Sequence, residues 1–225
     1  MLDYRNEWKH VISYSDMVAI RQRLRVAAQP DPHAGPDGRY EIRSLYFDTP
    51  TDRALREKID GVGIREKFRL RYYNGDTGLI HLEKKSKVNG LCNKQSATIT
   101  AQEAQKLLDG DLSWMPKSGR PLVIELYSKM HSQGLRPKTI VDYTREPFIY
   151  APGNVRVTID YNIRTGLGCT DFLNPNCITI PAGEPVRILE VKWDEFLPGI
   201  IRDAVQLTGR SSSAFSKYRI CRIYG

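Results

Sequence analysis

Cationic side chains alternate with apolar ones in residues 64–73, IREKFRLRYY. Because successive side chains of a strand point to opposite faces, this segment is predicted to be a strand with one cationic and one apolar face, Glu66 being the exception. The cationic face carries Arg65, Lys67, Arg69 and Arg71. A helix would spread these cations around its axis and leave no apolar stripe. A charged strand face is most often simply solvated, but a row of cations also suits a polyanion such as nucleic acid or a chain of phosphates.

Similar alternation recurs later in the chain. The segments that show it are 79–87, 155–161 and 187–193. The first places Glu83 and Lys85 on one face, and the last places Glu190 beside Lys192. Polar faces on many strands favour a closed or nearly closed barrel with a polar lumen, but a sandwich with solvated charges would show the same alternation. A plain ion pair between Glu190 and Lys192 is likewise an alternative to a binding site.

The elements that must position these side chains are mostly antiparallel strands within one domain, residues 1–225. Eight strands are predicted, at 4–14, 40–47, 64–73, 78–87, 92–100, 137–145, 155–161 and 187–193. Helices are predicted at 16–28, 101–109, 121–132 and 196–208. Ser15 is expected to cap the first helix, and Thr100 with Glu103 forms a capping box for the second.

Composition limits the partners and the compartment. Lys and Arg number 34 against 26 Asp and Glu, a net charge of +8, which implies a polyanionic partner such as nucleic acid, anionic lipid or phosphate chains. No apolar run approaches the roughly 18–20 residues of a membrane-spanning helix, and the charged residues 1–10 cannot form the apolar part of a signal peptide. The four cysteines are dispersed and form no CxxC pair, so a cytoplasmic location is expected.

Short motifs occur in a characteristic order over residues 4–220. They are RxExK at 5–9, YFDT at 46–49, RxKxRxRYY at 65–73, LEKK at 82–85, VDYxR at 141–145, RVTID at 156–160, LEVK at 189–192 and FSKY at 215–218. Together they resemble the VTC domain, the catalytic domain of the vacuolar transporter chaperone polyphosphate polymerase. That family lies within the triphosphate tunnel metalloenzyme (CYTH-like) superfamily.

The resemblance implies an α+β fold, an eight-stranded antiparallel β-barrel tunnel with peripheral helices. It implies transfer of the γ-phosphoryl group of ATP to a polyphosphate chain, with a divalent metal, Mn²⁺ or Mg²⁺, as cofactor. ATP and polyphosphate or triphosphate would then be the ligands. A membrane-protein partner is left open, because eukaryotic members of the family belong to membrane complexes.

Carried over to this sequence, the resemblance assigns three sets of residues. The catalytic set is Lys9, Arg69, Arg71, Lys85, Lys94, Arg145, Arg156 and Lys217. Further phosphate contacts are expected from Arg65, Lys67, Lys192 and Ser216. The metal ligands would be Glu190 and Glu7, a role that suits carboxylate oxygens, although Glu7 could instead neutralise neighbouring cations.

One departure from the superfamily pattern bears on the reaction. Tunnel triphosphatases usually begin with ExExK, but Arg5 stands at the first glutamate position, which removes a metal ligand and adds a cation. This favours the polymerase over an inorganic triphosphatase or nucleotide phosphohydrolase of the same fold. A non-catalytic module that binds polyphosphate or RNA is a third hypothesis. Nucleic acid is not expected, since no RNP-like, KH or zinc-knuckle signature occurs.

Overall fold

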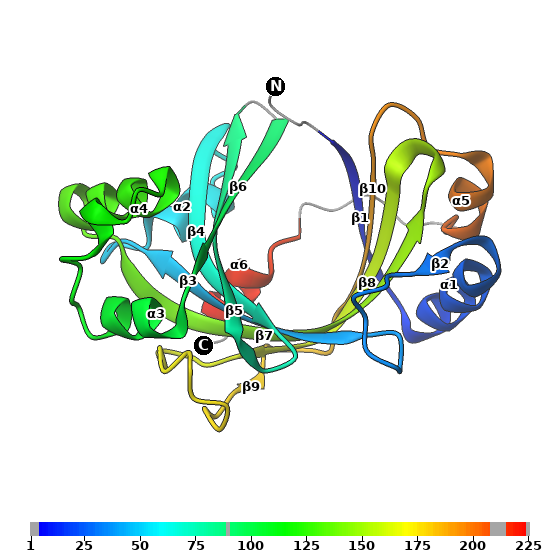
Figure 1. Cartoon of the computed structure of the whole chain (residues 1–225). Coiled ribbons are helices and arrows are strands. Elements are labelled where there is room, and N and C mark those ends of the chain that lie inside the picture. The colour runs from blue at the N-terminus through cyan, green and yellow to red at the C-terminus, as the bar shows by residue number, and fades with distance from the viewer. Residues whose placement is uncertain (1–4, 89–90, 208–214, 224–225) are drawn as a thin grey trace.

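Antiparallel strands form one strongly curled sheet in the computed structural model, which describes residues 5–88, 91–207 and 215–223 (Figure 1). Eight strands follow the order β1-β10-β8-β7-β3-β4-β5-β6, and the short strands β2 and β9 pair with β7 and β8. The strands are β1 Asn6–Ile12, β2 Gln29–Pro30, β3 Tyr40–Asp48, β4 Ile64–Tyr73, β5 Asp76–Val88, β6 Leu91–Ile99, β7 Arg136–Tyr150, β8 Val155–Thr165, β9 Ile180–Pro181 and β10 Arg187–Trp193. The predicted eight-stranded antiparallel α+β architecture is therefore confirmed.

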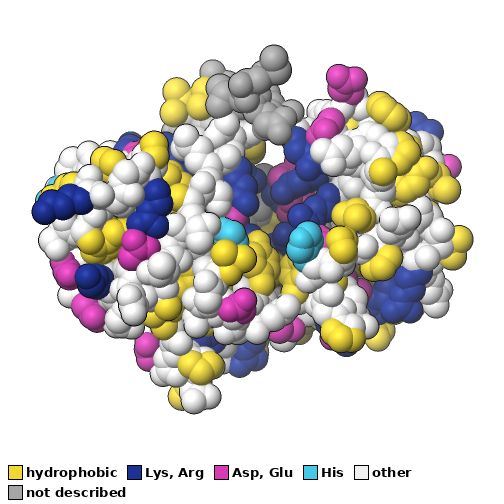
Figure 2. Space-filling view, in the orientation of Figure 1, with side chains coloured by type: hydrophobic (Ala, Val, Ile, Leu, Met, Phe, Trp, Pro, Cys, Tyr) yellow, Lys and Arg dark blue, Asp and Glu magenta, His cyan; other side chains and the backbone are white. Residues whose placement is uncertain are grey.

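The curled sheet is a half-barrel rather than a closed ring. Within the described residues, β1 and β6 are the two ends of the strand order, and no backbone pairing joins them. A side-chain contact crosses the opening instead, since Lys85 Nζ of β5 lies 3.6 Å from Glu7 Oε2 of β1. The space-filling view shows a hollow between two lobes, with Lys and Arg side chains gathered inside it (Figure 2).

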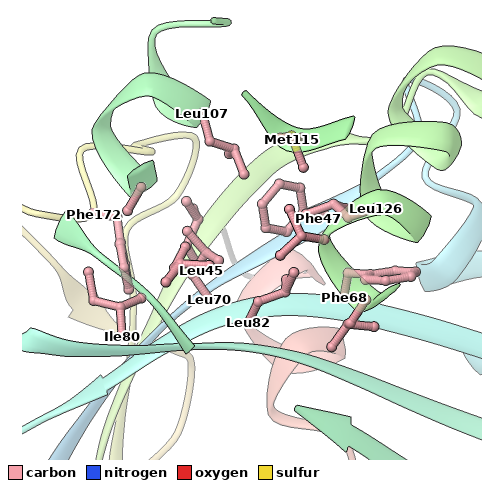
Figure 3. Packing of buried hydrophobic residues seen from close by; sticks show 14 of the residues in the cluster. Leu45, Phe47, Phe68, Leu70, Ile80, Leu82, Leu107, Met115, Leu126 and Phe172 are labelled. Atoms are coloured by element: carbon pink, nitrogen blue, oxygen red, sulfur yellow. The ribbon is translucent and has the colours of Figure 1, made fainter. Parts of the chain in front are cut away.

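Helices α1 Tyr14–Ala27 and α5 Gly199–Ala204 cover the convex face on one side of the hollow, and α3 Ala101–Leu108 and α4 Pro121–Gln133 cover it on the other (Figure 1). Helix α6 Lys217–Ile223 lies between the two lobes, and α2 Arg53–Ile59 packs against α6 and β4. Two 3-10 turns are η1 Met115–Lys117 and η2 Pro152–Asn154. Helices α3 and α4 pack with β4 and β5 around a core that contains Phe68, Leu70 and Leu82 (Figure 3). A second core joins α1 and α5 to β8 and β10. The apolar face predicted for 64–73 is thus buried from Phe68 to Tyr72, although Ile64 at its start is exposed, and the cations of β4 point toward the hollow.

The capping predictions were right for α3 and off by two residues for α1. Thr100 and Glu103 form the reciprocal capping box of α3, with the Glu103 amide 3.1 Å from Thr100 Oγ1. In α1 the cap is Ser13, whose hydroxyl accepts from the Asp16 amide, because the Asp16 carboxylate returns a bond to the Ser13 amide and completes a second capping box. Ser15 lies inside the helix.

Two short helices were not predicted, and both depend on Asp48 at the end of β3. The Asp48 carboxylate accepts hydrogen bonds from the backbone amides of Ala54 and Leu55 at 2.8 and 3.2 Å, which holds the start of α2. The Tyr218 hydroxyl donates to the same carboxylate at 2.5 Å, which anchors α6. The YFDT motif therefore ties α2 and α6 to the sheet.

Several predicted boundaries need correction. Helix α5 begins only at Gly199, after Pro198, and ends at Ala204, so it is shorter than the predicted 196–208, whose last residue lies outside the described part of the chain. Strand β7 extends to Tyr150, beyond the predicted end at 145, because Pro147 is accommodated opposite Thr158. No helix of the described residues has the length and apolar character needed to cross a membrane.

Candidate active site

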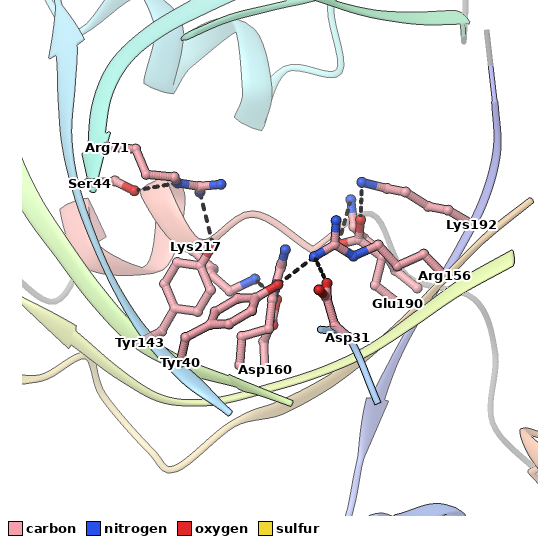
Figure 4. A network of polar contacts seen from close by, with 12 residues as sticks. Asp31, Tyr40, Ser44, Arg71, Tyr143, Arg156, Asp160, Glu190, Lys192 and Lys217 are labelled. Carbon is pink, nitrogen blue, oxygen red and sulfur yellow. Dashed lines mark hydrogen bonds and ion pairs between the residues drawn. The ribbon is translucent and has the colours of Figure 1, made fainter. Parts of the chain in front are cut away.

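The residues predicted for the site come from seven strands and one helix and meet on the concave face. Glu7 and Lys9 lie on β1, Glu190 and Lys192 on β10, Arg156 on β8, Arg145 on β7, Arg65, Lys67, Arg69 and Arg71 on β4, Lys85 on β5, Lys94 on β6 and Lys217 on α6, with Ser216 just before it. Two walls face each other across the hollow, one bearing Arg71 and the other Lys192 and Glu190 (Figure 4). The curl of the sheet thus gathers residues far apart in sequence.

Two lysines and two glutamates form a quartet on β1 and β10. In the strand register Lys9 lies opposite Glu190 and Glu7 opposite Lys192. Lys192 Nζ is 2.6 Å from Glu190 Oε1 and 3.6 Å from Glu7 Oε2, and Lys9 contacts both carboxylates. Burial alone would raise the pKa of Glu190, but the charges of Lys192 and Lys9 hold it well below its ordinary value. Burial and Glu190 tend to raise the pKa of Glu7, but Lys9, Lys85 and Lys192 lower it overall, so both carboxylates are ionised at neutral pH.

The arginines of β4 are fixed by Glu83 of β5. Arg69 Nη2 lies 2.6 Å from Glu83 Oε2, Arg71 Nη1 lies 3.7 Å from the same atom, and Lys94 also contacts this carboxylate. Burial tends to raise the pKa of Glu83, and the neighbouring Arg69 and Arg71 outweigh it, so the pKa falls far below its usual range. Arg71 is only 4% exposed and donates further to Ser44 Oγ at 3.1 Å and Tyr143 Oη at 2.9 Å (Figure 4).

Asp160 holds a third group of cations at the floor of the hollow. Its carboxylate accepts a bidentate pair from Arg145, at 2.6 and 2.7 Å, and a bond of 2.5 Å from Lys217 of α6. Asp160 is fully buried, which by itself raises the carboxyl pKa, but Arg145 and Lys217 lower it overall. Arg156, on the same strand, donates to Asp31 at 2.8 Å instead.

Lys67 differs from these cations because no carboxylate of the described residues pairs with it. Its Nζ lies 3.2 Å from Ser216 Oγ and 5.5 Å from the centre of the Tyr218 ring. Burial lowers the pKa of Lys67 to about 8, and the nearby Lys58, Lys85 and Arg65 act in the same direction. Electrostatically, this part of the hollow would gain most from an incoming anion.

Glu7 and Glu190 are suited to one divalent cation shared with a bound phosphate. The described residues contain no group of three or more side chains able to hold a metal by themselves. Mg²⁺, however, is commonly held by one or two carboxylates together with substrate phosphate oxygens. On β8, Thr158 lies opposite Glu190 and Arg156 opposite Lys192. The Thr158 hydroxyl and Arg156 Nε are buried without a hydrogen-bond partner among the described residues. Such orphaned polar atoms fit a site that is completed by a ligand.

Some residues of this face were missed or misjudged from the sequence. Tyr46, whose hydroxyl accepts from Arg69 at 2.8 Å, and Tyr143 were not predicted, and only the pairing of distant strands reveals them. Asp160 shares the alternating face of Arg156, and that period of two could have identified it. The extra cation expected from Arg5 does not join the hollow, because its Nε pairs with Asp194 Oδ1 at 2.7 Å beyond the end of β10.

The fold and this charged concave face define a protein of the triphosphate tunnel fold. The VTC domain family profile matches residues 4–223, so the chain belongs to the VTC domain family. No curated protein matches this chain. Among solved structures, a Bacillus halodurans protein provisionally assigned as an adenylate cyclase has a TM-score of 0.52 at 16% identity, covering 84% of this chain and 80% of that one. The PH1819 protein of Pyrococcus horikoshii OT3 has a TM-score of 0.49 at 13% identity, with coverages of 96% and 94%.

Proposed function

We propose that this protein is a polyphosphate polymerase that transfers the γ-phosphoryl group of ATP to the end of a phosphate chain, with a divalent cation as cofactor. The observation that carries the proposal is the concave face itself. Cations from seven strands and α6 line one hollow, and the two carboxylates best placed to share a metal lie together on β1 and β10. Membership of the VTC domain family supports the same reaction.

Arg69 and Arg71 would bind the transferring phosphoryl group. Phosphoryl transfer asks a protein mainly for in-line positioning and charge stabilisation. Both guanidinium groups are already oriented before substrate arrives, by Glu83, Ser44 and the tyrosine hydroxyls. Little reorganisation is then needed when negative charge shifts from the γ-phosphate to the leaving group.

Glu190 and Glu7 would hold the divalent cation, which supplies charge neutralisation to the phosphate oxygens when bound. The lysines that now contact these carboxylates, Lys9 and Lys192, would then be available to donate to phosphate oxygens. Thr158 Oγ1 and Arg156 Nε, which have no partner among the described residues, lie on the strand next to β10 and would donate there as well.

No side-chain nucleophile is required by this reaction. A terminal oxygen of the acceptor chain attacks the γ-phosphorus, a new P–O bond forms, and the bond from that phosphorus to the β,γ-bridging oxygen breaks to release ADP. In the hydrolytic alternative water replaces the acceptor chain, and the donor site would be the same. The absence of the first glutamate, at Arg5, favours the polymerase within the superfamily pattern.

Incubation with ATP and Mn²⁺ tests the proposal. Products are resolved on a gel for polyphosphate and assayed in parallel for ADP and free phosphate, with Glu190→Gln as the control for metal-dependent turnover. The proposal predicts ADP and long polyphosphate in matching amounts. ADP with an equal amount of free phosphate and no polymer would identify a nucleotide phosphohydrolase. No ADP, but phosphate released from inorganic triphosphate, would identify an inorganic triphosphatase, and neither reaction would identify a binding module.

A further inference from the structure

Five cations at one end of the hollow have no carboxylate partner among the described residues. This group, the bare cluster, consists of Lys58, Arg65, Lys67, Lys87 and Arg219. Lys58 lies on α2 and Arg219 on α6, neither of which was predicted from the sequence, and Lys87 lies near the end of β5. The side-chain hydrogen bonds of the cluster are those of Lys67 with Ser216 and of Arg65 with the Val62 carbonyl.

The five cations are close enough to repel one another. Arg65 and Lys87 are direct cross-strand neighbours, and like charges in that position are unfavourable. Helix α2 packs against β4 and α6, which brings Lys58 over this pair. Burial lowers the pKa of Lys58, and the charges of Arg65, Lys87 and Arg219 lower it further. Glu57, also on α2, does not neutralise these cations because it pairs with Arg53.

Elsewhere on the concave face, each group of cations has its own carboxylate. Glu83 pairs with Arg69 and Arg71 of β4, and Asp160 pairs with Arg145 and Lys217. Glu7 and Glu190 pair with the lysines of β1 and β10. We call cations that have a carboxylate partner compensated. An uncompensated cluster beside compensated cations indicates a place where a ligand supplies the missing negative charge.

We propose that the bare cluster is a subsite for the extended phosphate chain, holding units beyond those at Arg69 and Arg71. The inference rests on the proposed function and adds the path that the bound phosphate chain follows through the hollow. Along β4 the cations from Arg65 to Arg71 recur every second residue and span about 20 Å, which is longer than three linked phosphates. The row continues from the bare cluster into the compensated face without interruption.

A phosphate chain fits the bare cluster better than single-stranded RNA does. Binding of single-stranded RNA relies on exposed aromatic rings on which bases stack. The aromatic side chains beside the cluster, Tyr46 and Tyr218, are buried, and the exposed apolar residues around it are aliphatic, such as Ile59, Val62 and Ile64. Charge without stacking surfaces matches a ligand that has phosphates and no bases.

The test compares two charge-matched double variants. Lys58→Gln with Arg219→Gln removes two cations of the bare cluster, whose side chains make no ion pair or hydrogen bond within the described residues. Lys106→Gln with Lys117→Gln removes two exposed cations from α3 and η1 and serves as the control. Dissociation constants are measured for long-chain polyphosphate, inorganic triphosphate and single-stranded RNA, without ATP, and melting curves verify that each variant is folded.

The subsite predicts that the first variant binds long-chain polyphosphate about tenfold more weakly, with triphosphate affinity within about twofold of wild type. The control variant should match wild type for both ligands. If the first variant lost equal affinity for both ligands, or if the control variant lost as much affinity, the cations would act only through the general positive charge of the protein. Either result would overturn the subsite. Tighter binding of RNA than of polyphosphate, lost in the first variant, would overturn it in favour of a nucleic-acid site.

The binding test of the subsite and the activity test of the polymerase can fail independently of each other. If the selective loss is found but ATP yields no polymer, the chain subsite stands and the polymerase fails. If polymer forms and the first variant binds long chains like wild type, the polymerase stands and the subsite fails. Should the first variant prove unfolded, Lys87→Gln replaces it, with Lys106→Gln alone as its control.

Discussion

Lys67 of the bare cluster lies on β4 with Arg69 and Arg71, but the charges of these side chains are balanced differently. Arg69 and Arg71 are held by Glu83, and Arg71 also donates to Ser44 and Tyr143. Lys67, two residues before Arg69 on β4, has the Ser216 hydroxyl as its hydrogen-bond partner and no carboxylate partner within the described residues. The compensated arginines are therefore positioned before any ligand arrives, whereas the bare cluster is strained by repulsion until an anion enters.

This difference suggests a division of labour. Catalysis benefits from groups that do not reorganise, and the compensated arginines meet that requirement. Holding a chain that must move on after each addition requires attraction without tight geometry, which lysines on half-exposed positions provide. The two regions should consequently respond in opposite ways when a cation is removed.

Arg71→Ala should give the largest effect. Loss of a positioned donor to the transferring group is expected to lower turnover by about 10²–10³-fold. It should also lower the free energy of unfolding by about 3 kcal/mol, because the change breaks a buried ion pair and leaves Ser44 and Tyr143 without their donor. Steady-state kinetics and denaturant unfolding measure the two effects. Wild-type turnover would contradict the assignment of Arg71 to the site.

Glu190→Gln should lower metal-dependent turnover by about 10²-fold while preserving phosphate-chain binding. Gln retains the size and one acceptor oxygen but loses the charge that attracts a divalent ion. Rate is titrated against Mn²⁺ for the variant and wild type, alongside polyphosphate affinity without metal. Superimposable Mn²⁺ curves would mean that Glu190 is only an ion-pair partner of Lys192.

Phosphate ligands should stabilise the fold in order of length: triphosphate, then pyrophosphate, then monophosphate. A ligand that binds only the folded state adds about 2.7 kcal/mol at a hundredfold excess over its dissociation constant, which for a chain of this size raises Tm by about 5–10 °C. This rise in Tm should become smaller as the salt concentration increases, because salt screens the exposed cations. Melting curves at matched ligand concentration show the order, and equal shifts for the three ligands would indicate non-specific screening.

Lys67→Met should give the smallest effect and the opposite sign from Arg71→Ala. Without ligand, removing one cation from the bare cluster is expected to raise Tm slightly. The pKa of Lys67 is about 8 in the folded protein against an ordinary 10.5. Between these values the unfolded chain binds more protons, so this lysine makes stability rise with pH in that window.

The free energy of unfolding should therefore rise less between about pH 8 and 10.5 in Lys67→Met than in wild type. Tyr46, whose pKa of about 8 also lies below its ordinary value, contributes in the same direction and leaves part of the slope. Denaturant unfolding at pH 7.5, 8.5 and 9.5 compares the two proteins. Identical slopes would show that Lys67 titrates normally in the fold.

Local pattern predicted the parts of the fold in which each strand buries one face. The alternation of residues 64–73 foretold both the core contacts of Phe68 and Leu70 and the cationic row opposite them. The α3 capping box was readable because its two residues are three positions apart. Short helices such as α2 have too few residues for a periodic signal, and α2 and α6 form because Asp48 receives bonds from residues that fold onto it.

Partnerships across the hollow could not be read locally. Arg71 and Tyr143 are 72 residues apart, and their contact depends on the registers of β4 on β3 and β3 on β7. Whether the sheet closes depends likewise on its accumulated curl, which alternation does not encode. The Arg5 side chain points away from the hollow because it pairs with Asp194 after the end of β10, and no sequence motif predicts this contact.

Crystals grown with polyphosphate offer the most direct test of the central claim, that the concave face holds a phosphate chain from the compensated arginines to the bare cluster. The account predicts continuous chain density that contacts Arg69 and Arg71 and runs on past Lys67 to Lys58 or Arg219. Chain density confined to the convex face, or none beside the arginines of β4 in crystals that retain ligand, would contradict it.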